Sequence, residues 1–126
     1  MEKFGENIKN LLTFFVDCAI INIENEKRGK SIFCIWLDDV RPAPSGFYSV
    51  YSVNEAKVAI MRAEAMNMTI YLDLDHDLGD YAEDGGDGIE LVKWLIETKR
   101  FYPISLHTMN PVGRDNMRAL IERYWR

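Results

Sequence analysis

The stretch YLDLDHDLGD (residues 71–80) begins as a buried β-strand would and carries four aspartates and one histidine. Neighbouring carboxylates repel one another, so this crowd costs stability unless a metal ion or bound protons share the site. Residues 73–90 contain eight carboxylates and no lysine or arginine, so this window carries a charge of −8 and the rest of the chain +3. The stretch therefore predicts the end of a strand and a charged site at the same place.

The composition is that of a single globular domain. The 126 residues are enough to bury a core, and 48% hydrophobic with 28% charged residues is ordinary for a soluble protein. A net charge of −5 argues against binding to duplex DNA through its phosphates. Cys18 and Cys34 lack metal-ligand spacing and predict free thiols in a reducing cytoplasm. Asp17 interrupts the first apolar run, which argues against a signal peptide or a membrane span.

Strand and helix patterns alternate along the chain after an initial helix. An amphipathic helix is expected over residues 6–26, with an apolar face of Ile8, Leu11, Leu12, Phe15, Ala19, Ile20 and Ile23. Strands are expected over residues 31–39, 47–52, 69–75 and 101–108. Helices are expected over residues 54–66, 87–100 and 110–125, capped by Ser52 or Asn54 in the first case and by Asn110 in the last. We therefore expect a helical extension over residues 1–30 and one α/β domain over residues 31–126.

This alternation predicts a parallel sheet of about four strands joined by right-handed crossovers. In such sheets the functional crevice lies outside the carboxyl ends of the strands. Polar side chains follow three of the predicted strands at that edge: Asp38 and Asp39 after the first, Asp75, His76 and Asp77 after the third, and His107 and Thr108 after the fourth. We expect these residues to meet in one site.

Carboxylates gathered at one edge suit a hard divalent cation that binds through oxygen. The metal candidates are Asp38, Asp39 and Asp75, with Asp77 in reserve, and the ion is expected to be Mg²⁺ or Mn²⁺. The acidic residues of the glycine-rich loop are better explained as turn formers or helix caps in solvent: Asp80, Glu83, Asp84 and Asp87.

The two histidines suit acid–base chemistry on a phosphate ester. His76 and His107 are candidates for a general base and a general acid, with metal ligation as the alternative role. The start of the last predicted helix suits a phosphate, because free N–H groups and the helix dipole point toward it. The candidate phosphate contacts are Thr108, Asn110, Gly113, Arg114 and, from the DDVRP stretch, Arg41.

Three motifs in order, WLDDVRPAP, LDHDLG and HTMNPVGR, resemble the cyclic-phosphate-processing receiver-like family from about Ile32 to the C-terminus. The resemblance implies a three-layer, receiver or flavodoxin-like fold with an extra N-terminal helix. In response-regulator receivers, Asp38 and Asp39 match the acidic pair, Asp75 the phospho-accepting aspartate and Thr108 the Ser or Thr of the fourth strand. The helix between the first two strands and the strand carrying the receiver lysine are both absent here, which puts phosphotransfer signalling in doubt.

The family resemblance implies the processing of cyclic or end phosphates on nucleotides or RNA. Together with the metal and histidine candidates above, it leads to the hypothesis of a metal-dependent phosphoesterase that acts on a cyclic phosphate of a nucleotide or an RNA end. The alternative is a non-catalytic receiver-like module that holds a metal or a phosphorylated ligand. The N-terminal helix is expected to cover the sheet face left free by the missing helix or to form a homodimer. Asp73, an extra carboxylate in this chain, has no assigned role.

Two other motif matches are rejected. DLDHDLGDYAED imitates a calcium-binding EF-hand loop, but Leu78 stands where glycine is needed and Asp84 where glutamate is needed. YLDLD resembles the Asp-x-Asp motif of haloacid-dehalogenase-like phosphatases, which would make Asp73 a nucleophile. That motif belongs on the first strand of a longer chain.

Overall fold

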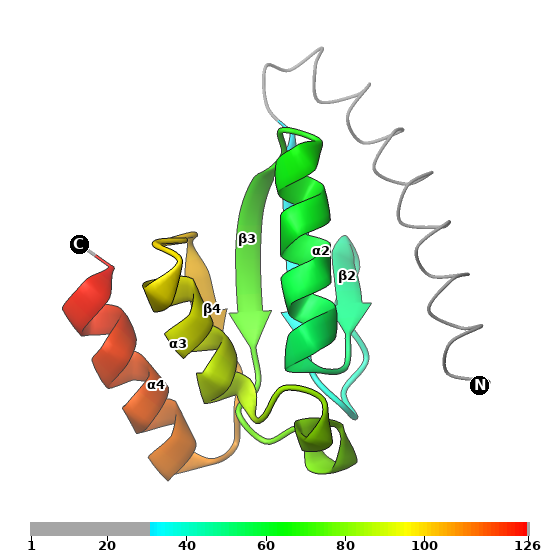
Figure 1. The fold of residues 1–126 in the computed structure, drawn as a ribbon. Coiled ribbons are helices and arrows are strands. Elements are labelled where there is room, and N and C mark those ends of the chain that lie inside the picture. Colours follow the sequence, from blue (N-terminus) through cyan, green and yellow to red (C-terminus); the bar gives the residue numbers. More distant parts are fainter. Residues whose placement is uncertain (1–30, 126) are drawn as a thin grey trace.

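The computed structural model describes residues 31–125, which form one four-stranded parallel sheet with the order β2-β1-β3-β4 (Figure 1). The strands are β1 (Ile32–Leu37), β2 (Phe47–Val50), β3 (Thr69–Leu74) and β4 (Ile104–Leu106). The helices are α2 (Val53–Ala65), α3 (Gly88–Glu97) and α4 (Pro111–Tyr124), with a 3₁₀ turn η1 (Gly79–Glu83). The α/β class and the parallel sheet are confirmed, whereas the helix expected over residues 6–26 lies outside the described residues.

The core lies between the sheet and its helices. Alternate residues of the two central strands are buried there, among them Ile35 and Leu37 of β1 and Leu72 and Leu74 of β3, each 0% exposed. The parallel register sets Ile35 beside Leu72 and Leu37 beside Leu74. Burying each such side chain contributes about 1.5–3 kcal/mol, so this layer fixes the register that brings the strand ends together.

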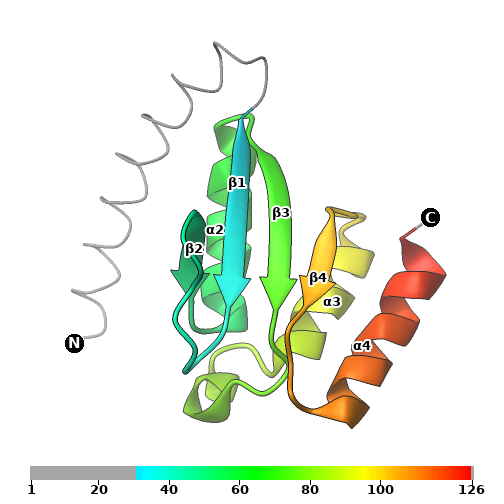
Figure 2. The same cartoon turned by 180° about the vertical axis from the view of Figure 1, so that it is seen from behind.

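The two crossover helices, α2 and α3, lie on the same side of the sheet. In Figure 1, α2 and α3 stand in front of the strands and α4 lies beyond β4. In Figure 2, the view from behind, the strands stand in front of α2 and α3. Right-handed crossovers from β2 to β3 and from β3 to β4 place α2 and α3 on one side, and α4, which follows the last strand, packs against α3. The described residues thus form two layers, and the layer expected on the second face falls on residues outside them.

Local capping fixes where the helices begin. The Ser52 hydroxyl accepts a hydrogen bond from the Glu55 N–H at 3.1 Å and donates to Asp84 at 2.7 Å, so it caps α2 and ties down the loop that follows β3. Asn110 caps α4 by accepting from the Gly113 N–H at 3.0 Å, with Pro111 in the first turn. Both caps agree with prediction. Within residues 31–125, no helix is long and apolar enough to cross a membrane.

Candidate functional site

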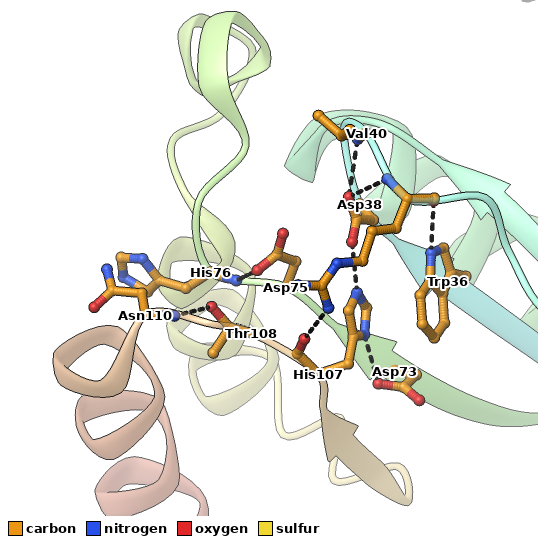
Figure 3. Close-up of polar contacts among 10 residues, drawn as sticks. Trp36, Asp38, Val40, Asp73, Asp75, His76, His107, Thr108 and Asn110 are labelled. Carbon is orange, nitrogen blue, oxygen red and sulfur yellow. Dashed lines mark hydrogen bonds and ion pairs between the residues drawn. The ribbon is translucent and has the colours of Figure 1, made fainter.

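The carboxyl ends of β1, β3 and β4 bring Asp38, Asp75 and His107 together. One ligand atom from each of these residues lies within 4.8 Å of the others. Figure 3 shows Asp75 between the Asp38–His107 contact on one side and His76 with Asn110 on the other. Three strands therefore supply one site at the sheet edge where sequence reasoning placed it.

Asp38 is the most enclosed charge of the site, with 1% of its surface exposed. One carboxylate oxygen accepts the N–H groups of Val40 and Arg41, both at 2.8 Å, so the aspartate closes the turn that follows β1. Its other oxygen lies 2.9 Å from Nε2 of His107. A buried carboxylate with this many partners is held in a single orientation.

His107 lies between two carboxylates and on an aromatic ring. Its Nδ1 is 2.7 Å from Asp73 and its Nε2 is 2.9 Å from Asp38, while its ring stacks on Trp36 at 3.6 Å between centroids. Because both acceptors are carboxylates, both ring nitrogens carry protons. Burial by itself lowers the pKa of His107, but the hydrogen bonds to Asp73 and Asp38 outweigh it and leave the pKa raised. His107 thus supplies part of the positive charge that offsets the repulsion between the carboxylates at this edge of the sheet.

Asp75 receives less compensation than Asp38. Its carboxylate accepts the His76 N–H at 2.7 Å. Burial and the nearby charge of Asp38 raise the pKa of Asp75, although a hydrogen bond from Thr108 opposes the shift. Thr108 is itself 6% exposed, and its hydroxyl oxygen accepts the Asn110 N–H at 3.1 Å. Asp75 therefore remains a carboxylate that an added cation would stabilise.

His76 is oriented by the start of α4. Its Nδ1 lies 2.7 Å from Asp77, and the Asn110 side-chain amide donates to both oxygens of Asp77 at 3.1 and 3.3 Å. The hydrogen bonds from His76 and Asn110 lower the pKa of Asp77. A Cβ on Gly113 would lie 2.5 Å from Cγ of His76, so only glycine admits the ring at this position. With Asp77 accepting from Nδ1, Nε2 of the neutral ring is the basic nitrogen.

The remaining predicted residues take different places. The carboxylate of Asp39 abuts Gly79, where a Cβ would lie 2.7 Å from Oδ2, and Asp39 is not among the residues grouped with Asp38 and Asp75. Asp77 groups instead with His76 and Asp87. The four predicted metal candidates thus do not form one cluster.

The two predicted arginine contacts also differ from each other. Arg41 donates from its guanidinium to the His107 carbonyl at 2.9 Å and so joins the turn after β1 to the end of β4. Nε of Arg114 is buried in the first turns of α4, 3.7 Å from Asp115, which is beyond hydrogen-bond distance. Arg41 therefore links the β1 and β4 sides of the site, whereas Arg114 lies on α4.

Sequence reasoning missed the parts that Asp73 and Trp36 play. Trp36 and Asp73 are register partners on β1 and β3, and Asp73 is in turn paired with Ser105 on β4. Trp36, Asp73 and Ser105 each lie two positions before a site residue, and residues two apart in a strand share a face. The site residues in question are Asp38, Asp75 and His107. That alternation was the available signal, because it sets Trp36, Asp73 and His107 on one face of the sheet.

The donor set fits a divalent cation. The oxygens of Asp38 and Asp75 suit Mg²⁺, and the nearby imidazole of His107 would extend the choice to Mn²⁺ if it released its proton. The raised pKa of Asp75 supports the same conclusion, since burial and the charge of Asp38 disfavour its ionised form and an added cation would relieve both effects.

The chain was compared with known families, curated proteins and solved structures. The family model described as a cyclic-phosphate processing receiver domain matches residues 33–123. No curated protein and no solved structure matched the chain. The matched range contains both histidines and every aspartate of the candidate site.

Proposed function

This chain belongs to the family of cyclic-phosphate processing receiver domains, and on that premise we propose that it is a metal-dependent phosphoesterase that opens a cyclic phosphate on a nucleotide or an RNA end. The observation that carries the proposal is the pair of differently bonded histidines on either side of Asp75. His76 has one carboxylate partner and His107 has two. Opening a cyclic diester needs a base and an acid together, and these environments favour opposite roles.

Asp38 and Asp75 would hold the metal ion, which would neutralise phosphate charge during the reaction. The phosphate would lie between these carboxylates and the start of α4, where the helix dipole favours an anion. Arg41, Thr108 and Arg114 would supply further donors to it.

In the proposed reaction, Nε2 of His76 takes a proton from water while the water oxygen forms a bond to phosphorus. The bond from phosphorus to one ring oxygen breaks, and that oxygen receives a proton from the doubly protonated His107. The product is a phosphate monoester beside a free hydroxyl. Asp77 and Asn110 keep the ring of His76 in place, and Asp73 holds the ring of His107.

The test is turnover of a panel of cyclic phosphates: 2′,3′-cyclic nucleotides, 3′,5′-cyclic nucleotides and RNA ending in a 2′,3′-cyclic phosphate. Each is incubated with Mg²⁺, with Mn²⁺ and with EDTA. We expect metal-dependent opening of at least one substrate and a loss of about 10²–10⁴-fold in His76→Ala, the usual contribution of a general base. Full activity in EDTA, or in His76→Ala, would contradict the mechanism.

A non-catalytic binding module is the second candidate, and the bonding of His107 favours it. Both nitrogens of this ring are already engaged by carboxylates, as expected of a structural cation. Such a module would bind a cyclic nucleotide without consuming it. Calorimetric binding with unchanged ligand on chromatography, for every member of the panel, would decide for this candidate.

A further inference from the structure

The second face of the sheet carries apolar side chains over β1, β2 and the first part of β3, beside Asp73 and His107 at the site edge, and no described helix covers it (Figure 2). Register pairing sets Cys34 beside Phe47 on one side and Tyr71 on the other. The rings of Phe47 and Tyr71 lie 6.1 Å apart, and Phe47 lies 5.9 Å from Trp36. Ile32, at the start of β1, is 47% exposed. An apolar patch of this kind is costly in water and indicates a partner.

We propose that residues 6–26 of the same chain pack as a helix against this second face. The segment joins the sheet directly, since residue 31 precedes the first residue of the central strand β1. A helix of this length spans roughly 30 Å. A six-residue strand such as β1 spans about 20 Å. The segment is therefore long enough to run back along the whole face.

The segment also has the side chains that such a contact needs. Its wide apolar stripe is formed by Ile8, Leu11, Leu12, Phe15, Ala19, Ile20 and Ile23. NEKRGKS, residues 25–31, supplies a polar, glycine-containing connection in which the chain can reverse. Covalent attachment raises the local concentration of the segment at the face to the millimolar range, which favours it over a second molecule.

Cys34 provides a direct readout because it lies on the second face and is a free thiol. The test uses the full chain carrying Cys18→Ser, so that Cys34 is the sole cysteine. Alkylation of Cys34 by a maleimide is timed with and without Leu12→Asp plus Phe15→Asp, which place charge in the middle of the stripe. We expect labelling at least about tenfold faster in the charged variant, equal to ~1.4 kcal/mol of covering free energy.

The matched control adds the same two charges to the polar side of the predicted helix, as Asn10→Asp plus Thr13→Asp. Its labelling rate should equal that of the parent. All variants are compared at one pH, because burial raises the pKa of the Cys34 thiol. Circular dichroism checks that the sheet domain stays folded. Equal labelling of Cys34 in the parent and the Leu12→Asp, Phe15→Asp variant would overturn the proposal.

A second measurement separates the chain's own segment from a second copy. The parent sequence, with both cysteines, is treated with a short bis-maleimide and digested for mass spectrometry. A Cys18–Cys34 cross-link within monomers, at a yield independent of protein concentration, is the expected result. A cross-link found only between chains, in a dimer that dissociates on dilution, would assign the face to a second molecule and reject the proposal.

Discussion

At the scale of single residues, the two histidines differ in the number and burial of their hydrogen-bond partners. His107 satisfies two carboxylates and stacks on Trp36, so its loss would leave Asp38 buried without a cation. His76 has one carboxylate partner, Asp77, whose side chain is 61% exposed. A buried charge that loses its partner keeps its full desolvation cost, whereas an exposed one is solvated by water. The two rings should therefore respond differently to removal.

We predict that His107→Ala lowers the free energy of unfolding by roughly 3 kcal/mol or more, because it leaves Asp38 unpaired in the interior. His76→Ala leaves no buried carboxylate behind and should cost clearly less. Urea denaturation of both variants at pH 7 measures the difference. Equal losses would show that His107 is not the structural cation of the site.

We further predict that Gly113→Ala destabilises the protein by about 1–3 kcal/mol, since the new Cβ meets the ring of His76. In a His76→Ala background the same substitution should become neutral or stabilising, because alanine favours a helix over glycine by about 0.5–1 kcal/mol. A double-mutant cycle by urea denaturation gives the coupling directly. A coupling near zero would mean that the ring does not rest on α4.

At the scale of elements, side chains that bridge two segments set the positions of the loops around the site. Ser52 caps α2 and also donates to Asp84, whose second oxygen accepts from the Asn54 amide at 3.0 Å. The glycine-rich loop is thus fixed at its far end to the start of α2. Asp84 was expected to be a solvated turn former, and its bridging role depends on a contact 32 residues away that no local pattern reveals.

Ser52→Ala removes the cap of α2 and the anchor of the loop together. We predict a loss of about 1–2 kcal/mol in the free energy of unfolding. Ser45→Ala, at an exposed position in the preceding connection, is the matched control and should change stability by less than about 0.5 kcal/mol. A similar small effect for both serines would refute the bridging role of Ser52.

A second bridge joins α2 to the segment before β4 and should depend on pH. The Glu64 carboxylate accepts two bonds from Arg100 at 2.9 and 3.1 Å and one from the Tyr102 hydroxyl. The bond from Arg100 is the main cause of the lowered pKa of Glu64, with burial opposing it. A carboxyl whose pKa is lower in the folded state stabilises it above the unfolded pKa and loses that effect as pH falls.

Glu64→Gln should therefore cost about 1 kcal/mol at pH 7, and the difference from the parent should close as pH falls below the ordinary value of 4.5. Urea denaturation between pH 7 and pH 3 measures this gap. Glu97→Gln, at an exposed position of α3, should follow the parent throughout. A gap that stays constant with pH would show that the ionised form of Glu64 is not what stabilises the fold.

At the scale of the whole molecule, the sequence predicted which residues lie at the carboxyl edge of the sheet, but not which of them bond to one another. Continuous apolar runs ending in Asp38, Asp75 and His107 reveal strand ends from local sequence, and parallel topology then brings them together. The pairing of carboxylates with histidines depends on the register between strands, which local sequence does not reveal. His107 bonds to Asp73, 34 residues away in the sequence, and to Asp38, 69 residues away. The placement of α2 and α3 on one side of the sheet, by contrast, follows from the order of crossovers alone.

The acidic crowd of residues 71–80 makes one further prediction for the molecule as a whole. If Asp38 and Asp75 hold a divalent cation in the folded state only, Mg²⁺ or Mn²⁺ must raise stability, by about 2.7 kcal/mol at a free concentration 100 times the dissociation constant. Asp75→Asn should abolish the increase, and EDTA should reverse it in the parent. Asp80→Asn removes the same charge from the exposed 3₁₀ turn and should keep the full response. Thermal unfolding across a metal titration distinguishes the cases. An equal response in both variants would mean that the ion is attracted by the acidic surface in general, and the metal site proposed at the ends of β1 and β3 would be wrong.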